Sequence, residues 1–286
     1  CKYLVVTRSS RVMAGCCGDT GHSSSSGNSS DPDKDLSSPP SLAALAQELG
    51  FKLSPLTLPK ECYTEFVLPK GKATCGLVWM HGLGDTEEGW ADMLEEDFRF
   101  PLGTCKFILP RAPRQRSTCN DGEVLTSWFD IARLPLNHRS APDHGCSLEE
   151  ALSSCGRVHA AIDKLVSDGI PAEKIVVGGF SQGGAMAMLS TLTYPRRLAG
   201  TIVFSGLCFF PDLVTQLAKY HHNEGLQVFW GHGTRDGVLD ADLQDEGVEI
   251  LQQAGFKVTI KKYVVDHGPS EEEIKDALDF FTAMLK

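Results

Sequence analysis

Short apolar stretches alternate with longer amphipathic stretches along most of the chain. The apolar stretches are a few residues long and rich in β-branched and aromatic side chains, which is typical of strands. We predict strands at Tyr63–Leu68, Cys75–Met80, Lys106–Leu109, Ile175–Val177, Thr201–Phe204, Gln227–Trp230 and Lys257–Val264.

Helical periodicity fills the segments between several of these strands. Leu152, Cys155 and Ile162, for example, recur at the spacing of one helix face. We predict helices at Leu148–Val166, Gln182–Tyr194, Leu239–Gln253 and Ser270–Leu285. Strands that alternate with helices of this length form a mostly parallel, doubly wound sheet, so the predicted fold class is α/β. Because no repeat or inner linker interrupts the pattern, residues 41–286 are expected to form one domain.

The N-terminal part of the chain has a different composition. Residues 15–40 are rich in Ser, Gly, Asp and Pro and cannot bury enough apolar surface to fold, so we predict a disordered tail over residues 1–40. Residues 1–14 contain three basic side chains and no acidic one, which is weak support for a transit peptide. Ser41 is placed to cap a short helix that Gly50 ends.

Charge and cysteine content exclude several classes of function. The formal net charge is −10 and no basic stripe offsets it, which argues against a nucleic-acid partner. None of the ten cysteines forms a Cys-x-x-Cys pair and no His-Glu-x-x-His occurs, so we predict no metal site. Cysteines such as Cys75 and Cys155 lie within predicted elements, which is typical of buried thiols in the reducing cytoplasm. No apolar run is long enough to span a membrane.

The strongest chemical signal lies between the strand Ile175–Val177 and the helix Gln182–Tyr194. Gly179-Phe180-Ser181-Gln182-Gly183 matches the G-x-S-x-G nucleophile elbow, in the strand-turn-helix context that this motif requires. The glycines keep neighbouring side chains away from the turn, and the helix directs its positive end toward developing negative charge. We therefore predict that Ser181 is a nucleophile rather than part of a structural turn.

A serine nucleophile needs a histidine base, which follows the serine and the acid in the chain order of α/β-hydrolases. That order excludes the histidines that precede Ser181, namely His81, His138, His144 and His159. His221 and His222 are expected at the surface, and His232 comes before any suitable acid, which favours a packing or loop role. His267, between the last strand and the last helix, is the predicted base.

The acid is expected in the loop after the preceding strand, where Asp236 is the first carboxylate. Asp240 and Asp242 are alternatives, but both are better explained as first-turn residues of the next helix. One oxyanion donor is expected to be the main-chain N–H of Gln182, and the other to come from the glycine-bearing loop Met80–Asp85 after an early strand.

Five motifs in order along residues 65–286 resemble the acyl-protein thioesterases and their lysophospholipase and carboxylesterase relatives. The motifs are His81-Gly82-Leu83-Gly84-Asp85-Thr86 with Gly89-Trp90, Pro110-Arg111-Ala112-Pro113, Ser127-Trp128-Phe129-Asp130, Gly178–Gly184 and Leu198-Ala199-Gly200. The resemblance implies an α/β-hydrolase fold with a minimal lid, no cofactor, and hydrolysis of thioesters or esters with long acyl chains. It also implies Ser181, Asp236 and His267 as the triad.

The resemblance further implies Leu83 and Gln182 as the oxyanion donors and Trp128 as a wall of the substrate site. Leu207, Phe209 and Phe210 follow a predicted strand and are candidates to line an acyl channel, although an ordinary buried helix start explains them equally well. Two positions differ from the family pattern. Gly237 replaces the usual proline after the acid, and Gly268-Pro269 follows the histidine in place of a small polar residue.

The sequence thus predicts a cytoplasmic serine hydrolase that removes acyl groups from protein cysteines or from lysophospholipids. A short-chain carboxylesterase is the alternative within the class. A non-catalytic binder is disfavoured because all three triad positions are filled. The oligomeric state is undetermined, and transient contact with a membrane surface stays open.

Cys16 and Cys17 form a pair within the predicted tail. Two S-acylated cysteines would suffice to anchor a chain to a membrane, where one acyl group is marginal. The simpler interpretation is an unmodified thiol pair, because such pairs carry little motif specificity.

Overall fold

The computed structural model describes residues 36–53, 58–97, 104–137 and 145–285. Almost all of the predicted tail, including Cys16 and Cys17, lies outside these residues, and so do His138 and His144. The predicted disorder and the hypothesis of S-acylation therefore stay predictions. Among the described residues, no helix is both long and apolar enough to cross a membrane.

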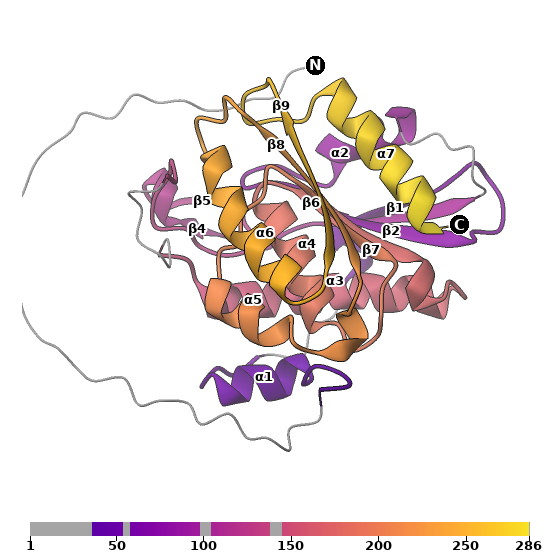
Figure 1. Cartoon of the computed structure of the whole chain (residues 1–286), viewed down its shortest axis with the longest axis horizontal. Helices are drawn as coiled ribbons and strands as arrows, with labels where there is room; N and C mark the ends of the chain where they lie inside the picture. The colour runs from indigo at the N-terminus through magenta and orange to yellow at the C-terminus, as the bar shows by residue number, and fades with distance from the viewer. Residues whose placement is uncertain (1–35, 54–57, 98–103, 138–144, 286) are drawn as a thin grey trace, which may run out of the picture. The chain divides into compact units, whose positions relative to one another are not determined.

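A seven-stranded sheet forms the centre of the domain, in the order β1-β3-β2-β6-β7-β8-β9 (Figure 1). The strands are β1 (Tyr63–Leu68), β2 (Cys75–Met80), β3 (Cys105–Pro110), β6 (Ile175–Phe180), β7 (Gly200–Phe204), β8 (Gln227–Gly233) and β9 (Lys257–Tyr263). β1 is antiparallel to β3, and the other neighbouring strands are parallel. The predicted strands are all present with ends shifted by a few residues, and the predicted α/β class is confirmed.

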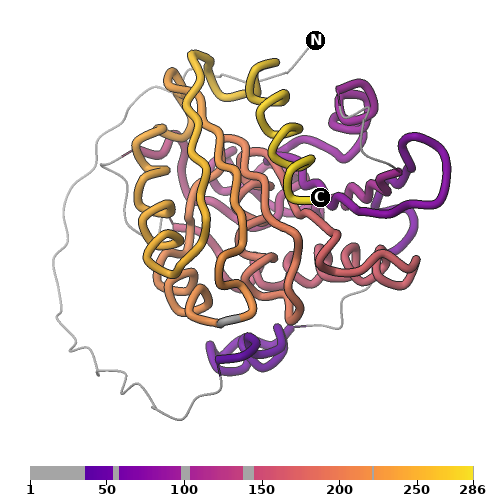
Figure 2. Tube along the Cα trace, turned by 45° about the vertical axis from the view of Figure 1, so that its right-hand side comes forward, coloured from indigo at the N-terminus to yellow at the C-terminus, as the bar shows by residue number. Residues whose placement is uncertain are grey.

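Helices cover both faces of this sheet. One face carries α3 (Leu148–Ser167), α4 (Gln182–Thr193), α5 (Pro211–Leu217) and α6 (Gln244–Gln253), with α1 (Leu42–Glu48) packed against α3. The other face carries α2 (Glu88–Asp97) and α7 (Glu271–Leu285). In Figure 2 the strands lie between the orange coil of α6 and the yellow coil of α7.

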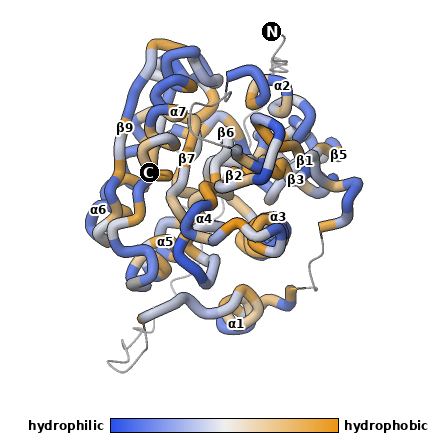
Figure 3. The backbone as a smooth tube through the Cα atoms, turned by 90° about the vertical axis from the view of Figure 1, so that its right-hand side faces the viewer, coloured by the Kyte–Doolittle hydropathy of each residue, from blue (hydrophilic) through white to orange (hydrophobic). Residues whose placement is uncertain are grey.

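Alternate residues of each central strand enter different cores. In β2, Leu77 and Trp79 pack under α2 and α7, whereas Val78 and Met80 pack under α3 and α4. Every residue of β2 is buried, as expected for a parallel strand that is covered on both faces. In Figure 3, hydrophobic stretches lie on the central strands β6 and β7, and hydrophilic ones lie mostly at the periphery.

Some elements were not expected from the sequence. The hairpin β4 (Arg114–Ser117) and β5 (Glu123–Thr126) is short and polar, and turns through Asp121 and Gly122, both with positive φ. The helices α2 and α5 are short, at 10 and 7 residues. The predicted helix Leu239–Gln253 is divided into a 3-10 turn and α6. The 3-10 helices of the described residues span Lys60–Cys62, Thr118–Asn120, Ala172–Lys174, His221–Asn223 and Ala241–Leu243.

Candidate active site

The predicted nucleophile stands on a sharp turn between β6 and α4. Ser181 has φ 56° and ψ −121°, a conformation that residues with a Cβ rarely adopt. Its main-chain N–H donates to the Phe204 carbonyl at the end of β7, 2.8 Å away, which holds the turn against the sheet. The serine is 9% exposed and its hydroxyl lies at the carboxyl end of the sheet.

The two outer glycines of the elbow are required by close main-chain packing. A Cβ on Gly179 would lie 2.4 Å from the Gly183 carbonyl oxygen, and a Cβ on Gly183 would lie 2.3 Å from that of Met80. Both distances are far below van der Waals contact. The turn therefore brings β6, α4 and the end of β2 together only because these positions lack side chains.

His267 reaches Ser181 from the loop between β9 and α7. Its Nε2 lies 2.9 Å from Ser181 Oγ, and its Nδ1 lies 2.6 Å from Asp236 Oδ2. The Phe180 ring, inside the elbow, packs against the imidazole with centroids 4.9 Å apart. The serine, the histidine and the aspartate thus form one hydrogen-bonded chain, although 86 residues separate the serine from the histidine.

Asp236 follows β8 and its side chain is fully buried. Its Oδ1 accepts hydrogen bonds from the main-chain N–H groups of Val238 and Leu239, at 2.8 and 2.9 Å. Burial alone would raise the pKa of Asp236, but the hydrogen bonds from His232 and His267 outweigh it and hold that pKa well below its usual range. The carboxylate is therefore ionised and fixed in orientation.

The alternative acids have other partners. Asp240 Oδ1 accepts the main-chain N–H of Asp242, 3.2 Å away, and caps the 3-10 turn. Asp242 lies in the first turn of that helix. Both positions agree with the helix-start role expected from the sequence, and the structure brings Asp236 alone of the three to His267.

The loop expected to complete an oxyanion site passes beside the serine. A Cβ on Gly82 would meet the Phe180 ring at 3.2 Å and Ser181 Cβ at 3.5 Å, so Leu83 follows at the edge of the elbow. Gln182 is the first residue of α4, and its N–H has no acceptor within the helix. The two predicted donors thus come from segments that adjoin Ser181.

His81 holds this loop in place. Its Nδ1 donates to the Gly82 carbonyl at 2.7 Å, and its Nε2 accepts the Ala112 N–H at 3.1 Å. Burial lowers the pKa of His81, which agrees with a neutral ring that donates on one side and accepts on the other. The Trp128 indole N–H donates to the His81 carbonyl, 2.8 Å away.

The Gln182 side chain has a role that the sequence did not reveal. Its Oε1 accepts the Trp128 N–H at 2.9 Å, and its Nε2 donates to the Phe129 carbonyl at 2.6 Å. Ser154 on α3 donates to the Trp128 carbonyl. These bonds fasten the loop of Trp128 to the start of α4. The sequence offered one signal, a long amide side chain at the start of a helix of small and apolar residues.

The candidate pocket residues lie mostly in the core. Trp128, Leu207 and Phe209 are 0%, 1% and 2% exposed, and Phe210 is half-buried. The Phe129 ring contacts Phe209 and Phe210 edge to face, at 5.3 and 5.6 Å. The structure brings Phe209 and Phe210 together around Phe129 and places Trp128 beside the oxyanion loop. Their role toward an acyl chain stays a prediction.

Among the described residues, no group of three or more His, Cys, Asp or Glu side chains is arranged to hold a metal ion. The cysteines of the same part of the chain are thiols that form no disulfide: Cys62, Cys75, Cys105, Cys119, Cys146, Cys155 and Cys208. Burial raises the pKa of Cys155 and of Cys208 to about 12, so these two thiols are protonated and unreactive.

Known proteins are similar to this chain in both sequence and fold. The chain is 38% identical to acyl-protein thioesterase 1 of Cryptococcus neoformans over 237 residues, which cover 77% of this chain and 96% of that one. It is 38% identical over 200 residues to a probable carboxylesterase of Oryza sativa, covering 69% and 73%.

Solved structures agree with these relatives. The Arabidopsis thaliana SOBER1 structure superposes with a TM-score of 0.68 at 29% identity and covers 74% of this chain and 99% of that one. Zea mays acyl-protein thioesterase 2 superposes with a TM-score of 0.63 at 27% identity, covering 78% and 99%. Residues 62–285 match the phospholipase/carboxylesterase family over the whole sheet and the serine elbow. The chain therefore belongs to the phospholipase/carboxylesterase family of α/β-hydrolases.

Proposed function

We propose that this protein is a serine hydrolase that cleaves acyl thioesters and esters, with S-acylated proteins or lysophospholipids as substrates. The observation that carries the proposal is the hydrogen-bonded chain from Ser181 through His267 to Asp236. The names of the relatives, acyl-protein thioesterase and carboxylesterase, support the thioester and ester chemistry. We place the reaction in the cytoplasm, which accords with the buried free thiols.

In the proposed mechanism, Ser181 Oγ attacks the acyl carbonyl carbon while His267 Nε2 takes the hydroxyl proton. Asp236 accepts a hydrogen bond from His267 Nδ1–H and so keeps that proton on Nδ1, which leaves Nε2 free to accept the serine proton. The N–H groups of Leu83 and Gln182 stabilise the oxyanion of the tetrahedral intermediate. The intermediate collapses as His267 returns the proton to the leaving thiol or alcohol. Water then attacks the acyl-enzyme by the same route and releases the acid.

Phe129, Phe209 and Phe210 form the apolar cluster that we propose to accept the acyl chain. A chain that entered between these rings would bury its methylenes, and each contributes ~0.8 kcal/mol, or about fourfold in kcat/KM. A short-chain esterase does not use such a cluster, so its kcat/KM would not rise with a longer acyl chain. The dependence of rate on chain length therefore separates the two candidate activities.

The test is hydrolysis of thioester and oxygen-ester substrates of increasing acyl length by wild type and Ser181→Ala. We expect kcat/KM to rise with length until the channel is full, and Ser181→Ala to retain only a residual rate, on the order of 10³ above water. A fluorophosphonate probe should label wild type and leave the variant unlabelled. A maximum at acetyl or butyryl would favour the short-chain carboxylesterase, and labelling of Ser181→Ala would overturn the nucleophile.

A further inference from the structure

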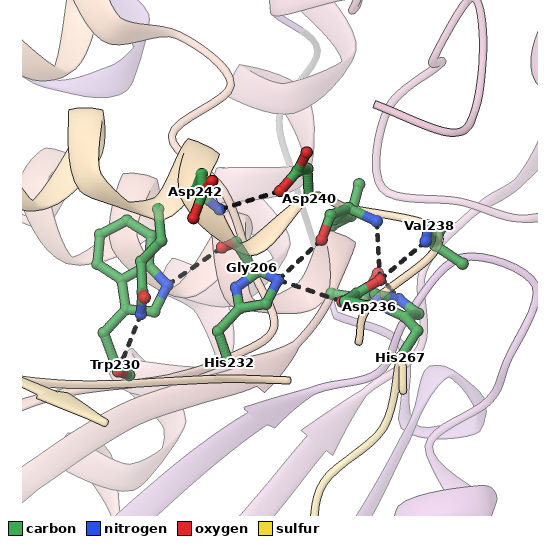
Figure 4. A network of polar contacts seen from close by, with 11 residues as sticks. Gly206, Trp230, His232, Asp236, Val238, Asp240, Asp242 and His267 are labelled. Atoms are coloured by element: carbon green, nitrogen blue, oxygen red, sulfur yellow. Dashed lines mark hydrogen bonds and ion pairs between the residues drawn. The ribbon is translucent and has the colours of Figure 1, made fainter. Parts of the chain in front are cut away.

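A second histidine contacts the buried aspartate from the side opposite His267. His232 lies near the carboxyl end of β8, and its side chain is fully buried. Its Nε2 is 2.9 Å from the Leu239 carbonyl oxygen and 3.2 Å from Asp236 Oδ2. Figure 4 shows His232 and His267 on either side of Asp236.

These contacts determine which ring nitrogen of His232 carries the proton. A main-chain carbonyl and a carboxylate are both acceptors, so Nε2 must be a donor. Nδ1 is buried and has no hydrogen-bond partner among the described residues. A second proton there would be buried without an acceptor, which is costly. The geometry therefore indicates a neutral ring that donates from Nε2 to Leu239 and Asp236.

Hydrogen bonds also anchor the strand before this ring and the loop after it. Trp230, two residues earlier on the same face of β8, donates its indole N–H to the Gly206 carbonyl at 3.1 Å, and its own carbonyl accepts from Gln244 (Figure 4). Leu239 closes the arrangement from the loop, because its N–H donates to Asp236 while its carbonyl accepts from His232. The imidazole thus connects the strand, the acid and the loop after the acid.

We propose that His232 is a positioning residue for the acid of the triad. By donating to Oδ2, it orients the carboxylate toward His267 and withdraws part of the charge that the carboxylate presents to the base. This inference rests on the proposed function, because it assigns His232 a role in the same site. Loss of the donor leaves the carboxylate loosely held and more negative toward His267, which favours the protonated, inactive form of the base.

Other charged groups on the neighbouring elements have their own contacts. Arg235 and Asp266, exposed beside the site, form an ion pair with each other, and Asp240 caps its own turn. Glu273 on α7 lies against Gly231 of β8. Successive residues of a strand face opposite sides of the sheet, so Glu273 and the His232 side chain lie on opposite faces. Within the described residues, the Asp236 carboxylate thus has its direct polar contacts with the two histidines and the loop N–H groups.

The test compares His232→Leu, which removes the donor, with His232→Gln, whose amide nitrogen reaches the place of Nε2. His159→Leu is the matched control, since His159 is an internal histidine whose Nε2 contacts the Ser190 carbonyl far from the triad. The rate of fluorophosphonate labelling is measured from about pH 5 to 9, where histidine bases titrate. kcat and KM are measured in parallel on a long-chain thioester.

We expect His232→Leu to lower the labelling rate and kcat about 10- to 100-fold, with KM little changed, and to move the acid limb of the profile to higher pH. His232→Gln should restore most of the rate and the limb, and His159→Leu should alter neither. An unmoved limb in His232→Leu, or equal losses in the Leu and Gln variants, would overturn the proposal. If His232→Leu does not fold, His232→Gln against His232→Asn, whose shorter amide cannot reach Asp236, makes the same comparison. Wild type that is not labelled would instead contradict the proposed function.

Discussion

At the scale of single residues, two aspartates four positions apart have different surroundings. Asp236 accepts a hydrogen bond from His267, whereas Asp240 accepts one from its own helical turn. In Asp236→Asn the amide would present a donor to His267 Nδ1 and favour the wrong tautomer. We expect kcat to fall by ~10⁴, as tautomer loss does in serine proteases, while Asp240→Asn changes little.

Steady-state kinetics of the two variants on one thioester check this prediction. Because both substitutions remove one negative charge and are nearly isosteric, each serves as the control for the other. The opposite ranking of the two losses would place the acid at Asp240 instead. Folding is verified by thermal unfolding, since Asp236 is the more buried of the pair.

At the scale of elements, the start of α7 carries a buried carboxyl group. Glu273 is 0% exposed, and a Cβ on Gly231 of β8 would lie only 2.1 Å from its Oε1. Burial raises the pKa of Glu273 to about 8 from an ordinary value of 4.5, against a smaller opposing effect of the Ser270 main chain. The helix therefore docks on β8 more favourably when this carboxyl is protonated.

The direction in which stability changes with pH follows from the number of protons that the folded and unfolded states bind. Between the unfolded pKa and the folded pKa, the folded protein holds a proton that the unfolded chain has released, so this contribution to stability falls as pH rises. Full ionisation costs at most about 5 kcal/mol. We expect Glu273→Gln to match wild type near pH 4.5 and to be more stable by several degrees in Tm near pH 9.

Thermal or urea unfolding at acidic, neutral and basic pH measures this difference. Glu272→Gln is the matched control, because Glu272 is exposed in the same helical turn. A stability gain for Glu273→Gln that is equal at every pH would show that the carboxyl does not titrate in the way proposed. An equal change of stability with pH in Glu273→Gln and Glu272→Gln would show the same.

At the scale of the whole molecule, the folded domain extends beyond the residues that match the family. Residues 62–285 match, yet α1 precedes them and places Leu45, 1% exposed, in the core beside α3. The domain of described residues thus has an N-terminal helix that covers the outer side of α3. Within residues 35–286, the described residues form one compact unit.

We expect Leu45→Ala to destabilise the protein by about 2 to 5 kcal/mol, because it leaves a cavity under α1. Leu49→Ala, at a position 37% exposed in the same segment, should cost much less. Differential scanning calorimetry gives both Tm values. Since α1 packs against α3, kcat at a permissive temperature should be unchanged. A Leu45→Ala variant as stable as Leu49→Ala would show that α1 is not part of the core.

Much of this protein is determined locally and was accessible from the sequence. The central strands are apolar runs whose burial on both faces is visible as nearly uninterrupted hydrophobicity, as in Cys75–Met80. The serine elbow requires glycines at fixed offsets, because main-chain atoms occupy the space of a Cβ at Gly179 and Gly183. The order of serine, acid and histidine follows from the order of strands along the chain. The predicted base, His267, accordingly lies within hydrogen-bond distance of both Ser181 and Asp236.

Other features depended on the tertiary structure. The sequence indicated a loop or packing role for His232, and only the return of residues 236–239 against β8 brings its ring to Asp236. The hydrogen bonds from the Gln182 side chain to the loop of Trp128, and the packing of the oxyanion loop beside Ser181, likewise join residues about 50 to 100 positions apart along the chain. The short hairpin β4–β5 has no periodic apolar face of its own. Hydrophobic periodicity indicates which side of a helix or strand is buried. It does not indicate which element packs against that side, because that element comes from a distant part of the chain.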